Sequence, residues 1–351
     1  MTSWPSLTLE DVTAFQFSNW YPIFSSLSIK STVVPLDDDF RSYLEADGIF
    51  VPIGSEDVPP KSTLEDYDQH SDDEATSPST QYAFPELDAR IRTVIDEYGA
   101  VFPKLNFSSP KDAAWLLPSS SPLKCTSPAD VYLLLKSSDF ITHDLDAASV
   151  FEGCVDGPGV PGGYRLELVL RKWFAIDPSR EMRAFVRDGV LVGISQRDTN
   201  YYEFLDEPET QRKILSSFIA HWAAHVQPKW TGPASYTFDV LLTRDLTRFH
   251  IVDFNPYAPR TDALLFSYAE LAALSSAAAA ATTPPTPVLR VVDSRGHPTA
   301  TRNAPEHQHN MVPLEALTLS HGRNVEEFAA AWMDQVRRGT AVGDSDDDSG
   351  E

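Results

Sequence analysis

Two apolar segments joined by a short polar turn, SYTFDVLLT and RFHIVDFNPY, constrain the fold of this chain more than any other feature. Their composition and spacing predict a β-hairpin. Residues two apart in a strand share a face, so Asp253 and Asn255 are expected to point the same way. With the turn centred near residues 245 and 246, Asp239 is expected opposite Asp253.

The three side chains of this hairpin predict a magnesium site. Two carboxylates that face each other across a hairpin repel, and their neighbours, such as Phe238 and Ile251, are too apolar for a freely solvated sheet edge. A cation would relieve the repulsion, and oxygen-only ligands suit magnesium, which leaves its other positions to water and nucleotide phosphates. An ordinary polar sheet face explains the same pattern, and the hairpin alone does not separate the two interpretations.

Residues upstream of the hairpin are candidates for binding phosphate. Lys104 lies in the predicted strand AVFPKLNF, on the same face as Asn106 and just before Ser108. A helix is expected to begin at Ser109-Pro110-Lys111-Asp112, where serine would be the N-cap, and helix amino termini bind anions. The same Ser-Pro-x-Asp pattern recurs at Ser127-Pro128-Ala129-Asp130. We therefore expect one helix to begin after Ser109 and another after Ser127.

Several arginines interrupt apolar segments and need anionic partners. Arg171 lies in the predicted strand YRLELVLRKWFAI, and Arg183 and Arg197 lie in EMRAFVRDGVLVGISQRD, a predicted hairpin that turns at Asp188-Gly189. Half-buried arginines pair with anions, which could be phosphates or the chain's own acids. The chain has neither a Walker P-loop nor a Rossmann glycine motif.

Two further segments predict helices. QRKILSSFIAHWAAHV has an apolar face made by Ile214, Leu215, Phe218, Ile219 and Trp222, and a helix is expected to start at TDALLFSYAELAAL. His221 and His225 have the spacing of a zinc pair, but without an HExxH motif we expect them on the surface or at the helix end.

The charge and the cysteine content exclude some classes of protein. The 351-residue chain carries a formal charge of −23, to which residues 56–74 contribute eight acids and one lysine, and the tail after Gly343 five more acids. Such stretches are expected to be solvated and unstructured, and nonspecific nucleic-acid binding is disfavoured. No apolar run is long enough to span a membrane, and the amino terminus MTSWPSLTLE lacks the basic-then-apolar order expected of a signal peptide. Only Cys125 and Cys154 occur, too few for a disulfide framework. A cytoplasmic location is expected.

Six sequence blocks together resemble the cell division cycle protein 123 (D123) family between about residues 15 and 270: FSNWYPIF, DGIFVP, VFPKLNFSSPKDAAW, LVLRKWFAI, EMRAFVRDGVLVGISQRD and IVDFNPY. The resemblance implies an α/β, ATP-grasp-like fold whose two lobes clamp the nucleotide. It also implies a monomeric assembly factor for eukaryotic translation initiation factor 2 (eIF2), which binds the gamma subunit and promotes joining of the alpha subunit.

The resemblance assigns roles to individual residues, with ATP and magnesium as cofactors. By this resemblance, Lys104 would contact phosphate, with Asn106 and Ser108 nearby, and Arg183 and Arg197 would face the phosphates. The backbone around Trp173 and Phe174 would hold adenine, with Arg171 close to the nucleotide. Asp239, Asp253 and Asn255 would hold magnesium.

We expect the chain to have six parts. They are 1–53, an N-terminal partner-binding segment packed on the core; 54–82, an acidic disordered linker; 83–275, the ATP-grasp core; 276–312, a variable insertion; 313–339, a C-terminal strand and helix; and 340–351, an acidic disordered tail. The aromatic-rich residues 12–30 are expected to form part of the partner surface.

Two alternative functions stay open. One is an ATP-grasp ligase that joins a carboxylate to an amine or thiol through an acyl phosphate, and the other is a degenerate fold that no longer binds nucleotide.

Overall fold

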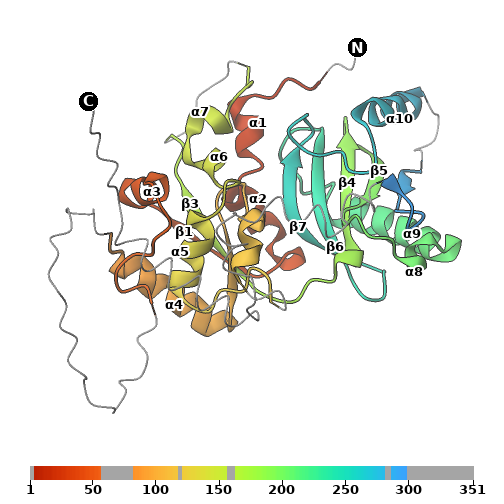
Figure 1. Ribbon diagram of the computed structural model, residues 1–351. Coiled ribbons are helices and arrows are strands. Elements are labelled where there is room, and N and C mark those ends of the chain that lie inside the picture. The colour runs from red at the N-terminus through yellow and green to blue at the C-terminus, as the bar shows by residue number, and fades with distance from the viewer. Residues whose placement is uncertain (1–3, 57–81, 118–120, 156–162, 281–285, 299–351) are drawn as a thin grey trace, which may run out of the picture. The chain divides into compact units, whose positions relative to one another are not determined.

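The computed structural model describes residues 4–56, 82–117, 121–155, 163–280 and 286–298, which divide into two compact units (Figure 1). The first unit contains the chain up to Ser31, the segment Asp146–Tyr164 and the described residues from Phe174 onward. The second contains Thr32–Leu145 and Arg165–Trp173. Each unit has its own sheet and helices, which confirms the predicted mixed α/β class with two lobes. The segment 1–53 passes from the first unit to the second after Ser31.

The first unit is built on a five-stranded sheet in the order β7-β6-β4-β5-β8. Neighbouring strands are antiparallel except β5 and β8, which run parallel. The strands are β4 (Glu181–Arg187), β5 (Val190–Gln196), β6 (Tyr236–Leu242), β7 (Phe249–Pro256) and β8 (Val288–Arg290). The predicted hairpin β4–β5 turns at Asp188 and Gly189, whose φ angles of 51° and 76° are those that a two-residue turn requires.

The β6–β7 hairpin has the predicted register at its polar residues. Asp239 pairs with Asp253, as expected. Between Asp239 and Val240 the register shifts by one residue, so that Val240 pairs with Ile251. This irregularity is a β-bulge, in which one strand carries an extra residue.

Aromatic residues and helices form the core of the first unit. Its helices are α1 (Leu9–Thr13), α2 (Phe17–Phe24), η1 (Ser25–Leu27), α7 (Ala147–Val150), η3 (Pro178–Arg180), α8 (Glu203–Asp206), α9 (Pro208–His225) and α10 (Tyr268–Ala280). Ile214, Phe218 and Trp222 of α9 are buried, which confirms its apolar face, although Leu215 and Ile219 are only half-buried.

The aromatic residues of the N-terminal segment are core residues. Phe15, Phe17, Trp20 and Phe24 are at most 1% exposed, and the rings of Trp20 and Phe24 each lie 5.3 Å from that of Phe254. The four rings are therefore interior, with those of Trp20 and Phe24 packed against β7. That residues 12–30 form part of the partner surface stays a prediction.

Helix α10 begins seven residues later than expected. The Ser267 hydroxyl accepts a hydrogen bond from the Glu270 amide at 3.3 Å, and the Glu270 carboxylate accepts one from the Ser267 amide at 2.8 Å. This reciprocal pair is a capping box, which fixes the start of the helix at Tyr268 rather than near Thr261. Residues 257–267 form a loop instead, and the Leu265 amide donates to the Ser195 hydroxyl on β5 at 3.3 Å.

The second unit is built on a three-stranded sheet in the order β1-β3-β2, in which β2 and β3 are antiparallel. Its elements are β1 (Ser31–Pro35), α3 (Asp38–Glu45), α4 (Pro85–Tyr98), β2 (Val101–Lys104), η2 (Lys111–Leu116), α5 (Pro128–Lys136), α6 (Thr142–Leu145) and β3 (Glu167–Lys172). A buried cluster that includes Ile91, Tyr132 and Leu168 joins the helices to the sheet.

The two Ser-Pro-x-Asp signals have different outcomes. Ser127 and Asp130 form the expected capping box at the start of α5. After Ser109 the predicted α-helix is wrong, because only the short 3₁₀ helix η2 forms and it has no side-chain cap. The Asp112 carboxylate accepts hydrogen bonds from the Ser138 hydroxyl at 2.5 Å and the Asp139 amide at 2.7 Å, so it is not available to cap a helix.

Some predictions fall outside the described residues: most of the linker 54–82, the C-terminal strand and helix 313–339 and the tail 340–351. Within the range 276–312 expected to be a variable insertion, the structure has the short strand β8. In the part of the chain that the structure describes, no helix is both long enough and apolar enough to cross a membrane.

Candidate functional site

Four polar residues lie side by side on one face of the five-stranded sheet. Ser195 of β5 pairs with Arg183 of β4, Arg183 pairs with Asp239 of β6, and Asp239 pairs with Asp253 of β7. Directly opposed residues share a face of a sheet, and Asn255 follows Asp253 on the same face because it is two residues further on. The first unit thus brings Arg183 together with all three predicted magnesium ligands.

Arg183 and Asp239 form a buried bidentate ion pair at the centre of this row. Nε of Arg183 donates to Oδ1 of Asp239 at 2.7 Å and Nη2 donates to Oδ2 at 2.9 Å, while Nη1 donates to the Asp262 carbonyl at 2.8 Å. Burial by itself lowers the pKa of the guanidinium, but the adjacent Asp239 carboxylate raises this pKa above its ordinary value overall. Arg183 is therefore a permanent cation held by the chain's own acid.

Arg197 extends the same network. Its Nε lies 3.2 Å from Oδ2 of Asp239, and its Nη1 lies 3.6 Å from the Glu181 carboxylate. Asp239 thus accepts from two guanidinium groups. The alternative interpretation of these arginines, that they pair with acids of the chain, describes the contacts of both Arg183 and Arg197.

The two other predicted ligands are more accessible. Asp253 and Asn255 are half-exposed, whereas Asp239 is 4% exposed. Asp239 already accepts hydrogen bonds from the guanidinium groups of Arg183 and Arg197. Within the described residues no three histidine, cysteine, aspartate or glutamate side chains are grouped to hold a metal. The three predicted ligands in this row are two acids and an amide. The oxygen-only set fits magnesium held chiefly by Asp253 and Asn255.

The second unit carries the predicted phosphate-binding residues. Lys104 is the last residue of β2 and is completely buried. The Asn106 amide donates to the Arg165 carbonyl at 2.8 Å and its oxygen accepts from the Glu167 amide at 2.8 Å. Asn106 therefore ties the end of β2 to the beginning of β3, and both ends of its side chain are used in doing so.

Ser108 contacts a carboxylate of the chain. Oδ2 of Asp144 accepts hydrogen bonds from the amides of Phe107 and Ser108 at 2.7 and 2.9 Å, and Oδ1 accepts one from the Ser108 hydroxyl at 2.8 Å. Asp144 is completely buried. The Ser108 amide and hydroxyl, which were expected near phosphate, donate to this acid, and the helix that follows is the 3₁₀ helix η2 and not the expected α-helix.

The predicted adenine-binding residues lie where β3 ends. Arg171 is 1% exposed and its guanidinium lies 5.4 Å from the ring of its cross-strand partner Phe102. The strand stops at Lys172, and the next residue, Trp173, donates from its amide to the Ala100 carbonyl at 2.9 Å. Phe174 is 39% exposed and belongs to the first unit. Adenine binding at these residues stays a prediction.

Comparison with known proteins identifies the family. The D123 family model matches residues 20–320. The chain belongs to the D123 family. A relative from Schizosaccharomyces pombe named "Translation initiation factor eIF2 assembly protein" is 37% identical over 95% of this chain and 98% of its own length. One of the same name from Xenopus laevis is 41% identical over 75% of this chain and 78% of its own.

A solved structure supports the same assignment. The structure of Cdc123 from Schizosaccharomyces pombe matches this D123 chain with a TM-score of 0.62 and 34% identity, covering 83% of this chain and all of the other. The family match extends beyond the region of about 15–270 in which the sequence blocks lie, and it covers the polar residues of both units.

The structure of this D123 protein adds residues that sequence reasoning missed. Asp144 organises the loop around Ser108, and Asp262 supplies the carbonyl that accepts from Arg183. No local motif marks Asp144, because its partners lie 36 and 37 residues away in the sequence. The pattern TDALLFSYAELAAL predicts a helix start at Asp262, whereas this residue lies in the loop 257–267 and its carbonyl is free of helical hydrogen bonding to accept from Arg183.

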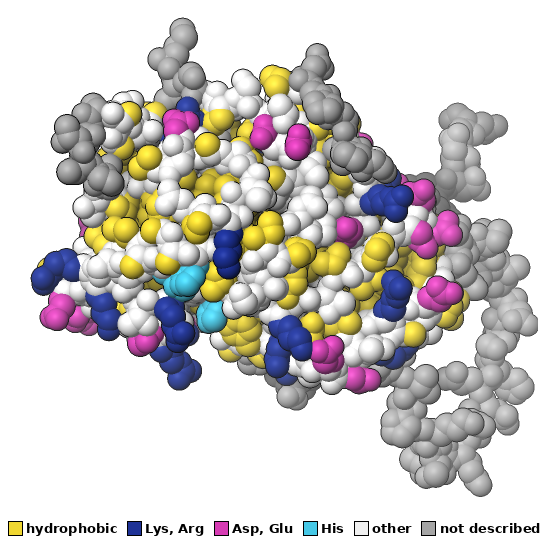
Figure 2. All heavy atoms as spheres, turned by 180° about the vertical axis from the view of Figure 1, so that it is seen from behind, with side chains coloured by type: hydrophobic (Ala, Val, Ile, Leu, Met, Phe, Trp, Pro, Cys, Tyr) yellow, Lys and Arg dark blue, Asp and Glu magenta, His cyan; other side chains and the backbone are white. Residues whose placement is uncertain are grey.

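His221 and His225, which have the spacing of a zinc pair, lie near the side chains of Arg248 and His250. His225 is exposed at the end of α9, as expected, but His221 is half-buried, with its ring 4.5 Å from that of Phe249. Burial, followed by the charges of His225, Arg248 and His250, lowers the pKa of His221 to about 4. Figure 2 shows histidine side chains next to lysine and arginine side chains on one face. Nearby cations disfavour binding of a metal ion here.

Proposed function

We propose that this protein is an ATP- and magnesium-binding assembly protein for eIF2, and that it contacts the gamma subunit. The observation that carries the assembly role is the similarity over 95% of the chain to a relative named as an eIF2 assembly protein. The gamma subunit as the contact, a monomeric state and a cytoplasmic location are parts of the same proposal and follow from the resemblance to the family.

The row of polar residues in the first unit supports the nucleotide part of the proposal. Asp253 and Asn255 would hold the magnesium ion, and bound magnesium would neutralise phosphate charge. Arg183 and Arg197 supply permanent positive charge beside these oxygens, and the ion pair with Asp239 fixes the direction of the Arg183 guanidinium. In the second unit, Asp144 holds the loop that follows Lys104 in one conformation.

The assembly role is tested by binding to the purified gamma subunit. The full chain, immobilised through an affinity tag, is expected to retain the gamma subunit, and adding the chain is expected to increase the yield of gamma–alpha complex. No retention in the presence of ATP and magnesium would overturn the proposed contact. Substrate-dependent release of ADP would instead favour the acyl phosphate ligase, because an assembly factor need not turn over ATP rapidly.

The nucleotide part is tested by thermal unfolding. ATP with magnesium at about 100 times its dissociation constant stabilises a protein by roughly 2.7 kcal/mol, so the midpoint of wild-type unfolding should rise measurably. Asp253→Ala is expected to abolish this rise. Asp293→Ala removes an exposed acid from the same unit and serves as the control that keeps the rise. An equal rise in Asp253→Ala would show that Asp253 holds no magnesium.

A further inference from the structure

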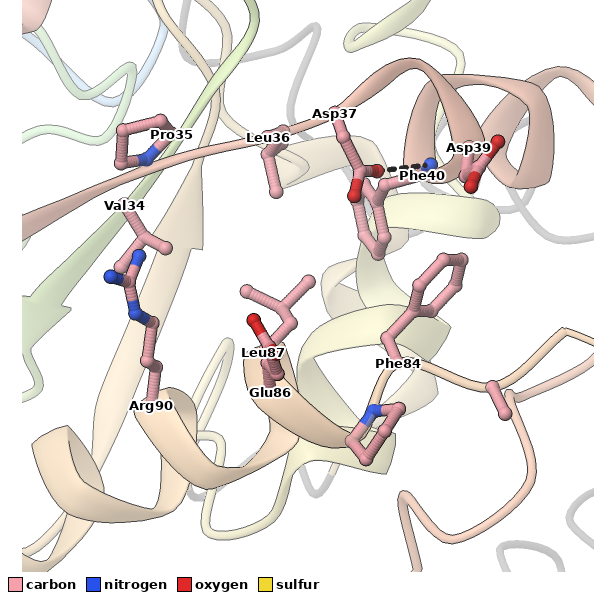
Figure 3. Close-up of a pocket in the computed structure, with 12 residues that line it drawn as sticks. Val34, Pro35, Leu36, Asp37, Asp39, Phe40, Phe84, Glu86, Leu87 and Arg90 are labelled. Atoms are coloured by element: carbon pink, nitrogen blue, oxygen red, sulfur yellow. Dashed lines mark hydrogen bonds between the residues drawn. The ribbon is translucent and has the colours of Figure 1, made fainter.

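A cavity of about 420 Å³ opens on the second unit, and none of the residues assigned to nucleotide binding is among its lining residues. It lies between the end of β1, the start of α3 and the start of α4 (Figure 3). Phe40 is 1% exposed, and Leu36, Phe84 and Leu87 are partly buried and pack against the core of the unit. The apolar floor is therefore continuous with a packed core.

The rim of the cavity is acidic. Asp37 and Asp39 from the start of α3 and Glu86 from the first turn of α4 line it, and all three are exposed. One oxygen of Asp37 accepts from the Phe40 amide at 2.8 Å, which fixes that carboxylate at the helix start (Figure 3). Arg90 is a cation among the lining residues, so acids outnumber it. An apolar floor beneath an acidic rim selects an apolar side chain that has a lysine or arginine beside it.

Charge argues against the acidic linker and against a second copy of the chain as occupants. Residues 56–74 hold eight acids and one lysine, and a second copy of the chain carries a net charge of −23. Either would bring like charge to the acidic rim, which disfavours binding. A partner that presents a basic and apolar segment has the complementary charge.

We propose that this cavity is a docking site for a segment of the partner protein that inserts an apolar side chain and places an adjacent lysine or arginine against Asp39 and Glu86. This proposal rests on the proposed function, because the eIF2 subunit contacted by this chain would present the segment. It names the surface that the family resemblance leaves open.

The experiment measures the affinity of the full-length chain for the gamma subunit by isothermal titration calorimetry. The double variant Asp39→Lys, Glu86→Lys reverses the rim charge at exposed positions and is expected to bind at least about fivefold more weakly, the effect of losing two partly exposed ion pairs. Ala83→Phe adds bulk at the cavity lining without changing the charge and is expected to weaken binding as well.

The matched control is Glu45→Lys, Asp96→Lys. It changes the net charge by the same amount on the same two helices, but at their exposed far ends, which do not line the cavity. Wild-type affinity in the control with weaker binding in both cavity variants supports the docking site. Equal affinity in all variants overturns the docking site and leaves the proposed function standing, whereas no binding by the wild type overturns both. A change in molar mass of the cavity variants by light scattering would assign the cavity to self-association and overturn the proposal.

Discussion

Nε of Arg183 lies 2.7 Å from Oδ1 of Asp239, and Nη2 lies 2.9 Å from Oδ2, so the two side chains form a bidentate ion pair. Both are at least nine-tenths buried. Removing one partner of a buried pair leaves an uncompensated charge, which costs far more than the net stability that the pair contributes. Asp239 therefore has a structural role whether or not it also contacts magnesium.

The first prediction compares the two acids of the hairpin. Asp239→Ala is expected to lower the free energy of unfolding by about 3–5 kcal/mol, because Arg183 is left buried without its carboxylate. Asp253→Ala, at a half-exposed position, is expected to cost about 1 kcal/mol or less. Urea unfolding without nucleotide measures both. Similar losses in the two variants would contradict the separate roles given to the two acids.

The second prediction concerns Asp144. Asp144→Ala removes the acceptor of three hydrogen bonds at a fully buried position, so the Phe107 and Ser108 amides and the Ser108 hydroxyl lose their carboxylate. We expect a loss of at least about 3 kcal/mol, since each buried donor left unsatisfied costs roughly 1–3 kcal/mol. Ser108→Ala removes one of these donors and keeps the acid, so it is expected to cost less. Chemical denaturation of both variants tests the order, and a larger loss in Ser108→Ala would refute it.

The third prediction is a pH dependence that arises from His221. Its pKa is about 4 in the folded protein and 6.5 as the ordinary value. Between these values the unfolded chain binds a proton at this histidine that the folded chain does not, so the free energy of unfolding falls as the pH is lowered from about 6.5 to 4. The groups that act on the ring are His225 on the same helix and Arg248 and His250 on the neighbouring hairpin.

The measurement is the free energy of unfolding at several pH values for the wild type and His221→Phe. Phenylalanine keeps a ring against Phe249 but cannot be protonated, so the variant is expected to have a shallower slope between pH 4 and 6.5. Nuclear magnetic resonance titration of His221 in the folded wild type provides a direct check. A slope unchanged by the substitution would mean that other groups cause the acid sensitivity.

The register of the β6–β7 hairpin could be predicted because it depends on local rules. The two-residue period of a strand and the position of the turn placed Asp239 opposite Asp253, and the structure confirms that pairing. The shift at Val240 was not predicted, since a bulge depends on packing on both faces of the sheet. The bulge lies between the turn and the two acids, so the pairing of Asp239 with Asp253 is as predicted.

Other features depend on contacts that are distant in the sequence. The Ser-Pro-x-Asp pattern occurs twice, but only Asp130 caps a helix, because Asp112 is held by Ser138 and Asp139. The aromatic residues near the N-terminus form a dense group in the sequence, and nothing local shows that Phe254 covers them. Asp144 and its partners form another contact of this kind, and no local pattern predicts that the Ser108 hydroxyl donates to this carboxylate.

The last prediction tests how the loop 257–267 and α10 pack on the sheet. Gly193 of β5 lies beneath Phe266 and Leu271, and a Cβ at this position would lie 3.1 Å from a carbon atom of each side chain. Both side chains are buried and can yield little space. Gly193→Ala is therefore expected to lower the free energy of unfolding by about 1–3 kcal/mol, as overpacking does, despite the smaller loss of backbone entropy on folding.

Combining Gly193→Ala with Leu271→Val makes room for the new methyl group, so the double variant is expected to be more stable than the sum of the two single effects predicts. Strict additivity in urea unfolding would show that the loop and helix can shift to accommodate a side chain at this position.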